Sequence, residues 1–309
     1  MIRGTTFRSG LFSIEPATKA WIFLFVFIAR PVWPQDPEAG VTQLDKTERV
    51  LRIDAYRPLD SAAQILASDY QIDISAEDSP FSCSKDVTDI HPSRKNALAA
   101  EHFYLPKGSN FQVRFSVDRL RYPLNIRGLL ADVVAAYNQS SAFQYRLQEN
   151  GDFYSFVPIA ARDARCRSIG ITALLDHRIS IPATTMEIYR AIAVIESALS
   201  AQVGEYVHVN TQDWLNRIPD FELSLSRGPA PARDFLLAII KATHYRFYWL
   251  VREQPYRRGW VINMIPLTRR VVKESGGGFH YPWVLWPGQK PLPPAPPPPA
   301  PRLKLRRTP

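Results

Sequence analysis

Residues that could carry catalysis are few in this 309-residue chain, and most stand alone. Asp176 and His177 are neighbours, and a carboxylate next to an imidazole can serve general acid–base catalysis when a pocket surrounds the pair. His208 falls in a predicted strand and His244 at the end of a predicted helix. A solvated or hydrogen-bonded side chain is the simpler interpretation of each histidine. We therefore assign no catalytic role to these histidines.

A metal site is the second chemistry to consider. His91 and His102 lie eleven positions apart, but no helical histidine pair or cysteine pair at zinc spacing accompanies them. The acidic run before them lacks the spacing of a calcium-binding EF-hand loop. We expect no metal and no cofactor, and we interpret the acidic run as a solvated loop. This run comprises Glu77, Asp78, Asp86 and Asp89.

Cys83 and Cys166 are the only cysteines of the chain. Neither has an adjacent histidine, so a thiol nucleophile is not indicated. An even pair in an oxidising compartment makes them candidates for a disulfide, which would close a loop of about 80 residues and stabilise by roughly 4 kcal/mol in the chain-entropy model. Two unpaired thiols remain the alternative, because the sequence does not show whether the Cα atoms lie within about 7 Å.

Sequence motifs of common catalytic folds are missing. The chain has no G-x-S-x-G nucleophile elbow, no P-loop, no G-x-G-x-x-G fingerprint and no C-x-x-C pair. Their absence does not exclude an enzyme, but it leaves catalysis without support from any pattern. We therefore expect a protein that is not an enzyme.

The first half of the chain shows the sequence pattern of an α+β module, whose helices and strands would position these residues. Apolar residues recur at helical spacing behind Arg57-Pro58, and alternating strands flank the pair Asn150-Gly151, which is a strong hairpin signal. The order β-α-β-β-α-β-β predicts a module over residues 48–160 with an insertion at 79–110. Its expected strands are 51–53, 72–74, 111–117, 143–147 and 153–157, and its expected helices are 58–69 and 125–138.

The second half repeats this order. The apolar spacing of the helix around Leu236 matches that of the helix around Leu130, 106 residues earlier. A repeated series of elements predicts two tandem copies of one small module, the second over 176–267, with each pair of helices packed on a sheet of its own. The expected strands are 179–181, 207–209, 221–225, 245–249 and 260–265, and the expected helices are 184–202 and 231–243.

The opening of the first module carries a resemblance. The stretch Ile53-Asp-Ala-Tyr-Arg-Pro-Leu-Asp-Ser-Ala62, followed by a helix and then Ile72-Asp-Ile74, resembles the secretin and TonB short N-terminal domain. The segment Glu77-Asp78-x-Pro80-Phe81 with Lys85-Asp86-Val87 is similar to a group of exported bacterial proteins with two such modules. The second copy has Thr185-Met186 in place of the Pro-Leu pair. The resemblance implies binding to protein partners in envelope complexes and supplies no catalytic residues.

The first 35 residues predict export. An unbroken apolar run from Trp21 to Ala29 follows basic residues and precedes prolines. This run is about half the roughly 20 residues that a spanning helix needs, which is the length of a signal-peptide core. We therefore expect a signal peptide at 1–35 and a periplasmic or extracellular protein. An uncleaved signal anchor is the main alternative.

The positive charge lies at the two ends. The net charge is +9, of which +3 falls in residues 1–35 and +7 in residues 269–309. The body between them is close to neutral, so we expect no nucleic-acid partner. Residues 276–309 follow a triple glycine, are aromatic, proline-rich and basic, and predict a disordered tail. Membrane contact is expected only through this basic tail or an uncleaved signal segment.

These patterns lead to one function hypothesis and its alternatives. We expect a non-enzymatic exported envelope protein that binds other envelope proteins, whose identity the sequence does not give. The first alternative is a ligand-binding protein that uses aromatic residues of the two hairpins. The second is a hydrolase with a site at the module interface. The candidate binding aromatics are Tyr145, Phe153, Tyr248 and Trp249.

Overall fold

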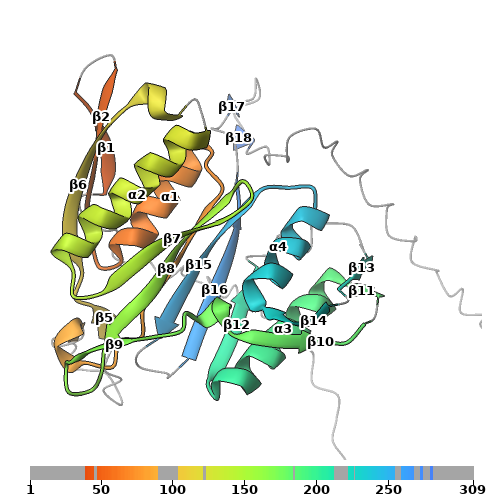
Figure 1. The fold of residues 1–309 in the computed structure, drawn as a ribbon. Coiled ribbons are helices and arrows are strands. Elements are labelled where there is room, and N and C mark those ends of the chain that lie inside the picture. Colours follow the sequence, from red (N-terminus) through yellow and green to blue (C-terminus); the bar gives the residue numbers. More distant parts are fainter. Residues whose placement is uncertain are drawn as a thin grey trace, which may run out of the picture. The chain divides into compact units, whose positions relative to one another are not determined.

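The computed structural model describes a mixed α+β fold (Figure 1). It covers residues 39–44, 47–89, 104–120, 123–183, 185–211, 222–225, 227–254, 259–267, 272–273 and 279–280. The predicted signal segment, most of the predicted tail, His91 and His102 lie outside these residues. None of the helices within the described ranges is long and apolar enough to cross a membrane. The α+β fold class is confirmed.

The four α-helices within the described ranges form close to where the apolar periodicity predicts them. They are α1 (Pro58–Tyr70), α2 (Pro123–Ser140), α3 (Ile188–Val203) and α4 (Ala232–Ala242). Proline suits the first position of α1, because its fixed φ is helical and its missing N–H would have no partner there. Gln71 after α1 and Gly204 after α3 adopt the left-handed conformation that commonly ends a helix.

The described residues contain more strands than the repeated order predicts, and the two halves differ in strand number. The first half contains β1 (Gly40–Gln43), β2 (Glu48–Ala55), β3 (Ile74–Glu77), β4 (Val87–Asp89), β5 (Tyr104–Pro106), β6 (Ser109–Ser116), β7 (Gln144–Asn150), β8 (Phe153–Arg162) and β9 (Ser168–Gly170). The second half contains β10 (Arg178–Ile181), β11 (Thr185–Glu187), β12 (Tyr206–Asn210), β13 (Glu222–Ser224), β14 (Arg227–Pro231), β15 (Phe247–Gln254) and β16 (Gly259–Pro266). A two-residue pair, β17 (Val272–Lys273) with β18 (Phe279–His280), flanks the triple glycine.

Three strand pairings of the first half have an equivalent in the second, whereas the pairs β1–β2, β4–β5 and β8–β9 have none among the described residues. In the first half, β2 pairs antiparallel with β6, and β8 pairs parallel with β3 and antiparallel with β7. In the second half, β10 pairs antiparallel with β14, and β16 pairs parallel with β12 and antiparallel with β15. Corresponding strands therefore have corresponding partners and directions.

The central sheet runs through both halves, so the prediction of a separate sheet for each half is wrong. Strand β3 pairs in parallel with β15, which gives the order β12-β16-β15-β3-β8-β7, with β9 added beside β8. Figure 1 shows the long strands of this sheet side by side. The physical reason is that β3 and β15 are edge strands within their own halves, and pairing satisfies their backbone groups.

Two apolar cores flank the shared sheet, and each takes residues from the other half. The first core surrounds α1 and α2 and includes Tyr248 and Leu250 of β15. The second core surrounds α3 and α4 and includes Phe153 of β8, which stacks on Trp249 with 4.4 Å between ring centroids. All described residues belong to one compact unit. The side chains that each half contributes to the other half's core help to hold the two halves together.

Candidate ligand-binding pocket

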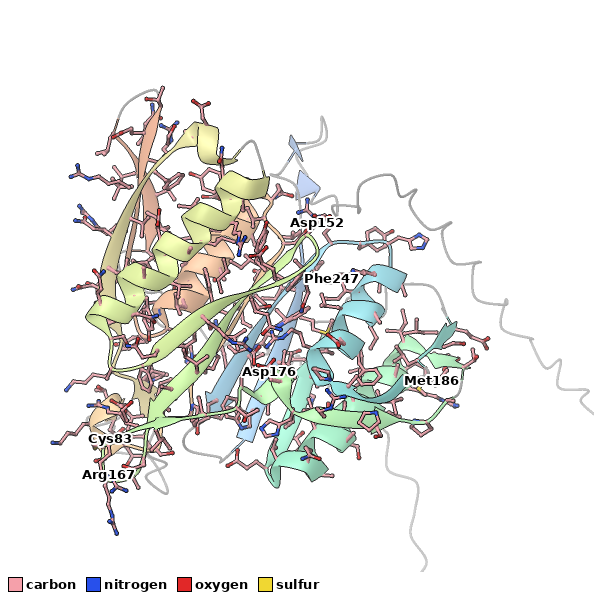
Figure 2. The ribbon with its side chains drawn as sticks, in the orientation of Figure 1. Cys83, Asp152, Arg167, Asp176, Met186 and Phe247 are labelled. Carbon is pink, nitrogen blue, oxygen red and sulfur yellow. A yellow bond between two sulfur atoms is a disulfide. The ribbon has the colours of Figure 1, made fainter. Side chains whose placement is uncertain are left out.

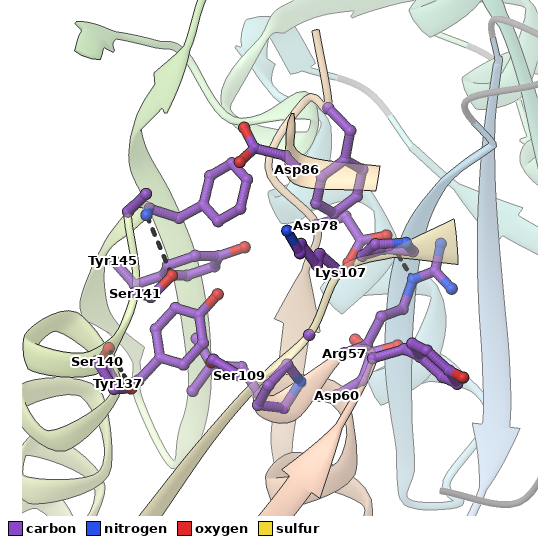
Figure 3. Close-up of a pocket in the computed structure, with 18 of the residues that line it drawn as sticks. Arg57, Asp60, Asp78, Asp86, Lys107, Ser109, Tyr137, Ser140, Ser141 and Tyr145 are labelled. Atoms are coloured by element: carbon purple, nitrogen blue, oxygen red, sulfur yellow. Dashed lines mark hydrogen bonds and ion pairs between the residues drawn. The ribbon is translucent and has the colours of Figure 1, made fainter. Parts of the chain in front are cut away.

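A polar cavity of about 350 Å³ lies in the first half (Figure 3). It is lined by segments 56–60, 77–86, 106–109 and 137–145, together with Arg162. The antiparallel pairing of β2 with β6 places the end of one beside the start of the other, with Ala55 opposite Ser109. The fold thus gathers segments that are distant in sequence.

Gly108 allows the close approach that forms one wall. Its φ is +76°, and a Cβ atom there would lie 2.5 Å from the carbonyl oxygen of Ala55. Glycine alone adopts this conformation without steric cost and leaves room for the neighbouring chain. Residues 106–109 therefore reach the cavity because position 108 has no side chain.

Two carboxylates of the cavity pair with arginines. Arg57 Nε donates to Asp78 Oδ2 at 2.7 Å, and this oxygen also accepts the backbone N–H of Glu253 at 3.1 Å. Arg252 Nε donates to Asp60 Oδ2 at 2.7 Å. Burial raises the pKa of Asp60 to about 6, although the charge of Arg252 opposes this rise. Asp60 is therefore mainly an anion at neutral pH, paired with Arg252.

The other two carboxylates of the cavity are paired as well. Arg162 Nε donates to Asp86 Oδ2 at 3.0 Å. Glu77 and its partner Arg233 are both fully buried, and the Leu175 N–H donates to Glu77 Oε2 at 3.2 Å. Burial raises the pKa of Glu77, and the neighbouring positive charge lowers it. No lining carboxylate is left without an arginine partner among the described residues.

Tyr137 and Tyr145 provide hydroxyl groups that point into the cavity (Figure 3). Their rings meet edge to face with 5.3 Å between centroids. Burial raises the pKa of Tyr137 to about 12 and that of Tyr145 well above its ordinary value. A backbone hydrogen bond from Ser79 reaches the Tyr145 hydroxyl. Both phenols therefore keep their protons and can donate to an acceptor in the cavity.

Three further polar groups remain available to a ligand. Lys85 and Lys107 are exposed at the cavity, and neither has an ion-pair partner in the described part of the chain. The buried Oγ of Ser109 has no hydrogen-bond partner there. Unpaired buried hydroxyls are uncommon in folded proteins. The cavity thus presents unsatisfied donors and no unpaired carboxylate.

The disulfide holds one side of this pocket. Cys83 and Cys166 are bonded, with 5.0 Å between their Cα atoms. Figure 2 places Cys83 near the turn that carries Arg167. The pair that the sequence offers as a candidate is therefore bonded in the structure, and it ties the segment before Lys85 to the end of β8.

A network of arginines and buried carboxylates joins the two halves. Acidic residues of the first half meet arginines of the second, in pairs that span more than 150 positions of the chain. The network also includes Asp176, which accepts from Arg233 at 3.0 Å. Local sequence patterns do not indicate these partners, although Arg233 lies on the apolar face of α4 with Leu236 and Ile240, where a charge is unexpected. The pairs are Asp60–Arg252, Asp73–Arg246 and Glu77–Arg233.

The Asp176-His177 pair is divided between two environments. Asp176 lies beside α4, where Arg233 contacts it (Figure 2). His177 instead lines a second cavity of about 430 Å³ between the halves, together with Glu205 and Trp260. Glu205 accepts the indole N–H of Trp260 at 2.7 Å. Asp176 is therefore ion-paired with Arg233 and does not act with His177 as its sequence position suggests.

The other histidines and the acidic run form no described metal site. His208 lies on β12, 3.3 Å from Glu196, and His244 has a left-handed φ of 62°. Within the described ranges, no group of three or more histidine, cysteine, aspartate or glutamate side chains is placed to hold a metal ion. The expectation of a solvated acidic loop is wrong for three members of the run, which are buried in arginine pairs. These are Glu77, Asp78 and Asp86.

The four candidate aromatics do not form a binding surface. Tyr145 lines the polar cavity, but Phe153, Tyr248 and Trp249 are each less than 5% exposed within the cores. The alternating pattern correctly places them in strands, yet both faces of the central sheet are covered. Sequence patterns do not single out Lys85 and Lys107, which line the polar cavity. Their position is notable only because the carboxylates around them are paired with arginines.

Comparison with known proteins adds no relative: no family model, curated protein or solved structure matches this chain.

Proposed function

We propose that this chain is an exported, non-enzymatic envelope protein that binds a partner protein through the pocket of its first half. In this proposal the chain consists of two modules of the secretin and TonB short N-terminal type. The equivalent strand pairing in the two halves supports the modules, and the disulfide supports export, because such bonds persist in oxidising compartments. The export signal and the basic tail would be its only membrane contacts.

The pairing of every lining carboxylate is the observation that carries this proposal. A general acid or base must exchange a proton with a substrate, and a metal ligand must offer a free lone pair. Carboxylates engaged by arginines are poorly suited to either role. Unpaired lysines and hydroxyls, in contrast, suit the recognition of a bound group. The pocket therefore favours binding over turnover.

Photocrosslinking in cells tests this function. A photoreactive amino acid at Ser140, which is exposed at the pocket, should give a discrete protein adduct. Lys85→Glu/Lys107→Glu in the same chain should abolish that adduct by charge repulsion. The same photoreactive residue at Tyr189, exposed on α3, is the matched control and should not give it. An adduct that survives the lysine changes, or no adduct from position 140, would contradict the proposal.

The cavity between the halves favours one alternative, a hydrolase with His177 as its base. His177 and Glu205 both line that cavity, and an imidazole can act as a general base. Purified protein would then hydrolyse small ester substrates, and His177→Ala would remove the activity while His208→Ala would not. We place this second because Asp176 is engaged by Arg233.

A further inference from the structure

We infer that the polar pocket binds a carboxylate group, held by the ammonium groups of Lys85 and Lys107 and the hydroxyls of Tyr137 and Tyr145. This inference rests on the proposed function, because it names the group that the pocket would recognise on its partner. The cavity of about 350 Å³ falls within the range of known small-ligand sites. It therefore has room for a side chain or a chain end rather than a whole domain.

The balance of charge in the pocket selects an anion. Four carboxylates line the cavity, and each is neutralised by an arginine. The two lysines have no such partner within the described residues, so they leave an excess of positive charge. A cationic ligand would meet this excess without any free carboxylate to bind it. An anionic ligand is the complement.

The arrangement of donors favours a carboxylate among anions. A carboxylate has about four lone-pair positions, and two ammonium groups and two phenol hydroxyls can fill them. Ser109, whose Oγ has no partner among the described residues, is one more donor at the cavity. The walls also include the rings of Phe81 and Phe143, which meet edge to face at 5.4 Å. These apolar walls suit the carbon skeleton that carries the carboxylate.

The disulfide is positioned to maintain the distance between the lysines. Cys83 lies two residues before Lys85, and its carbonyl accepts the backbone N–H of Asp86 at 2.9 Å. The carbonyl of Asp86 accepts the N–H of Lys107 at 2.7 Å. The bond to Cys166 therefore fixes the short segment from which both lysines are held. Reduction of the bond should weaken carboxylate binding, because the two ammonium groups stay charged but their separation is no longer fixed.

Calorimetry with matched peptides tests the inference on the oxidised mature chain. The probes are N-acetyl-Ala-Glu-Ala-amide, its Gln counterpart, N-acetyl-Ala-Ala-Ala with a free carboxyl end, and inorganic phosphate. We expect the Glu peptide or the free-end peptide to bind, and which one binds identifies a side chain or a chain end as the source. The Gln peptide and phosphate should bind at least about tenfold more weakly, since charge-assisted hydrogen bonds are lost or misplaced.

Matched variants connect this binding to the pocket. Lys85→Gln/Lys107→Gln should weaken binding by about tenfold or more, since both ammonium contacts are lost, and reduction by dithiothreitol should also weaken it. Lys241→Gln, at an exposed lysine of α4, is the control and should not change it. Circular dichroism of each variant separates a lost site from a lost fold.

Several outcomes would overturn the inference. They are equal binding of the Gln and Glu peptides, preference for phosphate, no binding of any probe, or binding that is unchanged in a folded lysine variant. The crosslink from position 140 separates the two proposals. If that crosslink persists while carboxylate peptides fail to bind, the proposed function stands and this inference fails. If both fail, the pocket is not a recognition site.

Discussion

Glu253 illustrates how a single carboxyl group can make this fold sensitive to pH. It lies on β15, and its Oε2 accepts the backbone N–H of Phe81 at 2.5 Å. Burial raises the pKa of Glu253 to about 7; the Phe81 hydrogen bond and the charge of Arg57 lower it, whereas Asp78 and Glu205 raise it. The folded chain therefore binds a proton at Glu253 more tightly than the unfolded chain does.

This shift predicts a stability difference between the wild type and Glu253→Gln. Because the folded pKa is raised, the stabilisation is complete below the unfolded pKa of about 4.3 and is lost as the pH rises through about 7. Over this window, the free energy of unfolding of the wild type should fall relative to that of Glu253→Gln by roughly 3 kcal/mol. Urea titrations at several pH values measure it.

The Glu253→Gln substitution removes the titration and keeps the hydrogen bond, because the oxygen of the new side-chain amide can still accept the Phe81 N–H. Glu222→Gln, at an exposed glutamate of β13, is the control and should follow the wild-type pH profile. Parallel profiles for the wild type and Glu253→Gln would show that Glu253 does not titrate in this window.

At the scale of elements, two glycines with similar positive φ allow the cost of backbone strain to be distinguished from the cost of a steric clash. Gly108 and Gly151 have φ of +76° and +68°. A Cβ atom at Gly151 would have no neighbour within 4 Å, whereas one at Gly108 would lie 2.5 Å from the Ala55 oxygen. Gly151→Ala should therefore cost about 1–2 kcal/mol of stability from backbone strain alone.

Gly108→Ala should cost about 1–3 kcal/mol more than Gly151→Ala, because the carbonyl group of Ala55 must move to admit the methyl group. Thermal and urea unfolding of both variants give the comparison. The pocket should also widen where β2 meets β6, so Gly108→Ala should weaken any ligand of the pocket while Gly151→Ala should not. Equal losses of stability would mean that the approach of residues 106–109 to β2 is easily relaxed.

The sequence predicts the elements better than it predicts their partners. Apolar spacing alone places α1 at 58–69 and α3 near 184–202, close to the observed Pro58–Tyr70 and Ile188–Val203. The parallel pairing of β3 with β15 joins two open strand edges that meet only after both halves fold. Local apolar periodicity predicts where strands form but not which distant strands pair. For the same reason, sequence patterns do not single out the lysines of the pocket, since their significance depends on which distant arginines neutralise the surrounding carboxylates.

At the scale of the whole molecule, the arginine network makes the two halves interdependent. Arg233 of α4 meets Glu77 of β3, and both are fully buried. Breaking a buried pair from one side leaves an uncompensated charge, which typically costs about 3–5 kcal/mol. The halves should therefore unfold together in one transition, because neither keeps its charges neutralised without the other.

Arg233→Met tests this dependence. We expect a loss of about 3–5 kcal/mol in the free energy of unfolding, and we expect Glu77→Leu/Arg233→Met to recover most of it, since no charge then remains buried alone. Urea unfolding followed by tryptophan fluorescence measures both. Arg190→Met, at an exposed arginine of α3, is the control and should change stability by less than about 0.5 kcal/mol. A similarly small change for Arg233→Met would mean that the stability of the contact between the two halves does not depend on the Arg233–Glu77 pair.

The place of β3 in the middle of the sheet has a consequence for biosynthesis. Ala76 of β3 pairs with Leu250 of β15, so 174 residues must be made after Ala76 before its partner is complete. Throughout that interval the nascent chain carries an open strand edge and an unneutralised Glu77. Long-range pairing of this kind is slow, and it leaves intermediates prone to aggregation. In the proposed exported protein, the same delay would keep the chain unfolded until its last strands are made, as passage through a translocation channel requires.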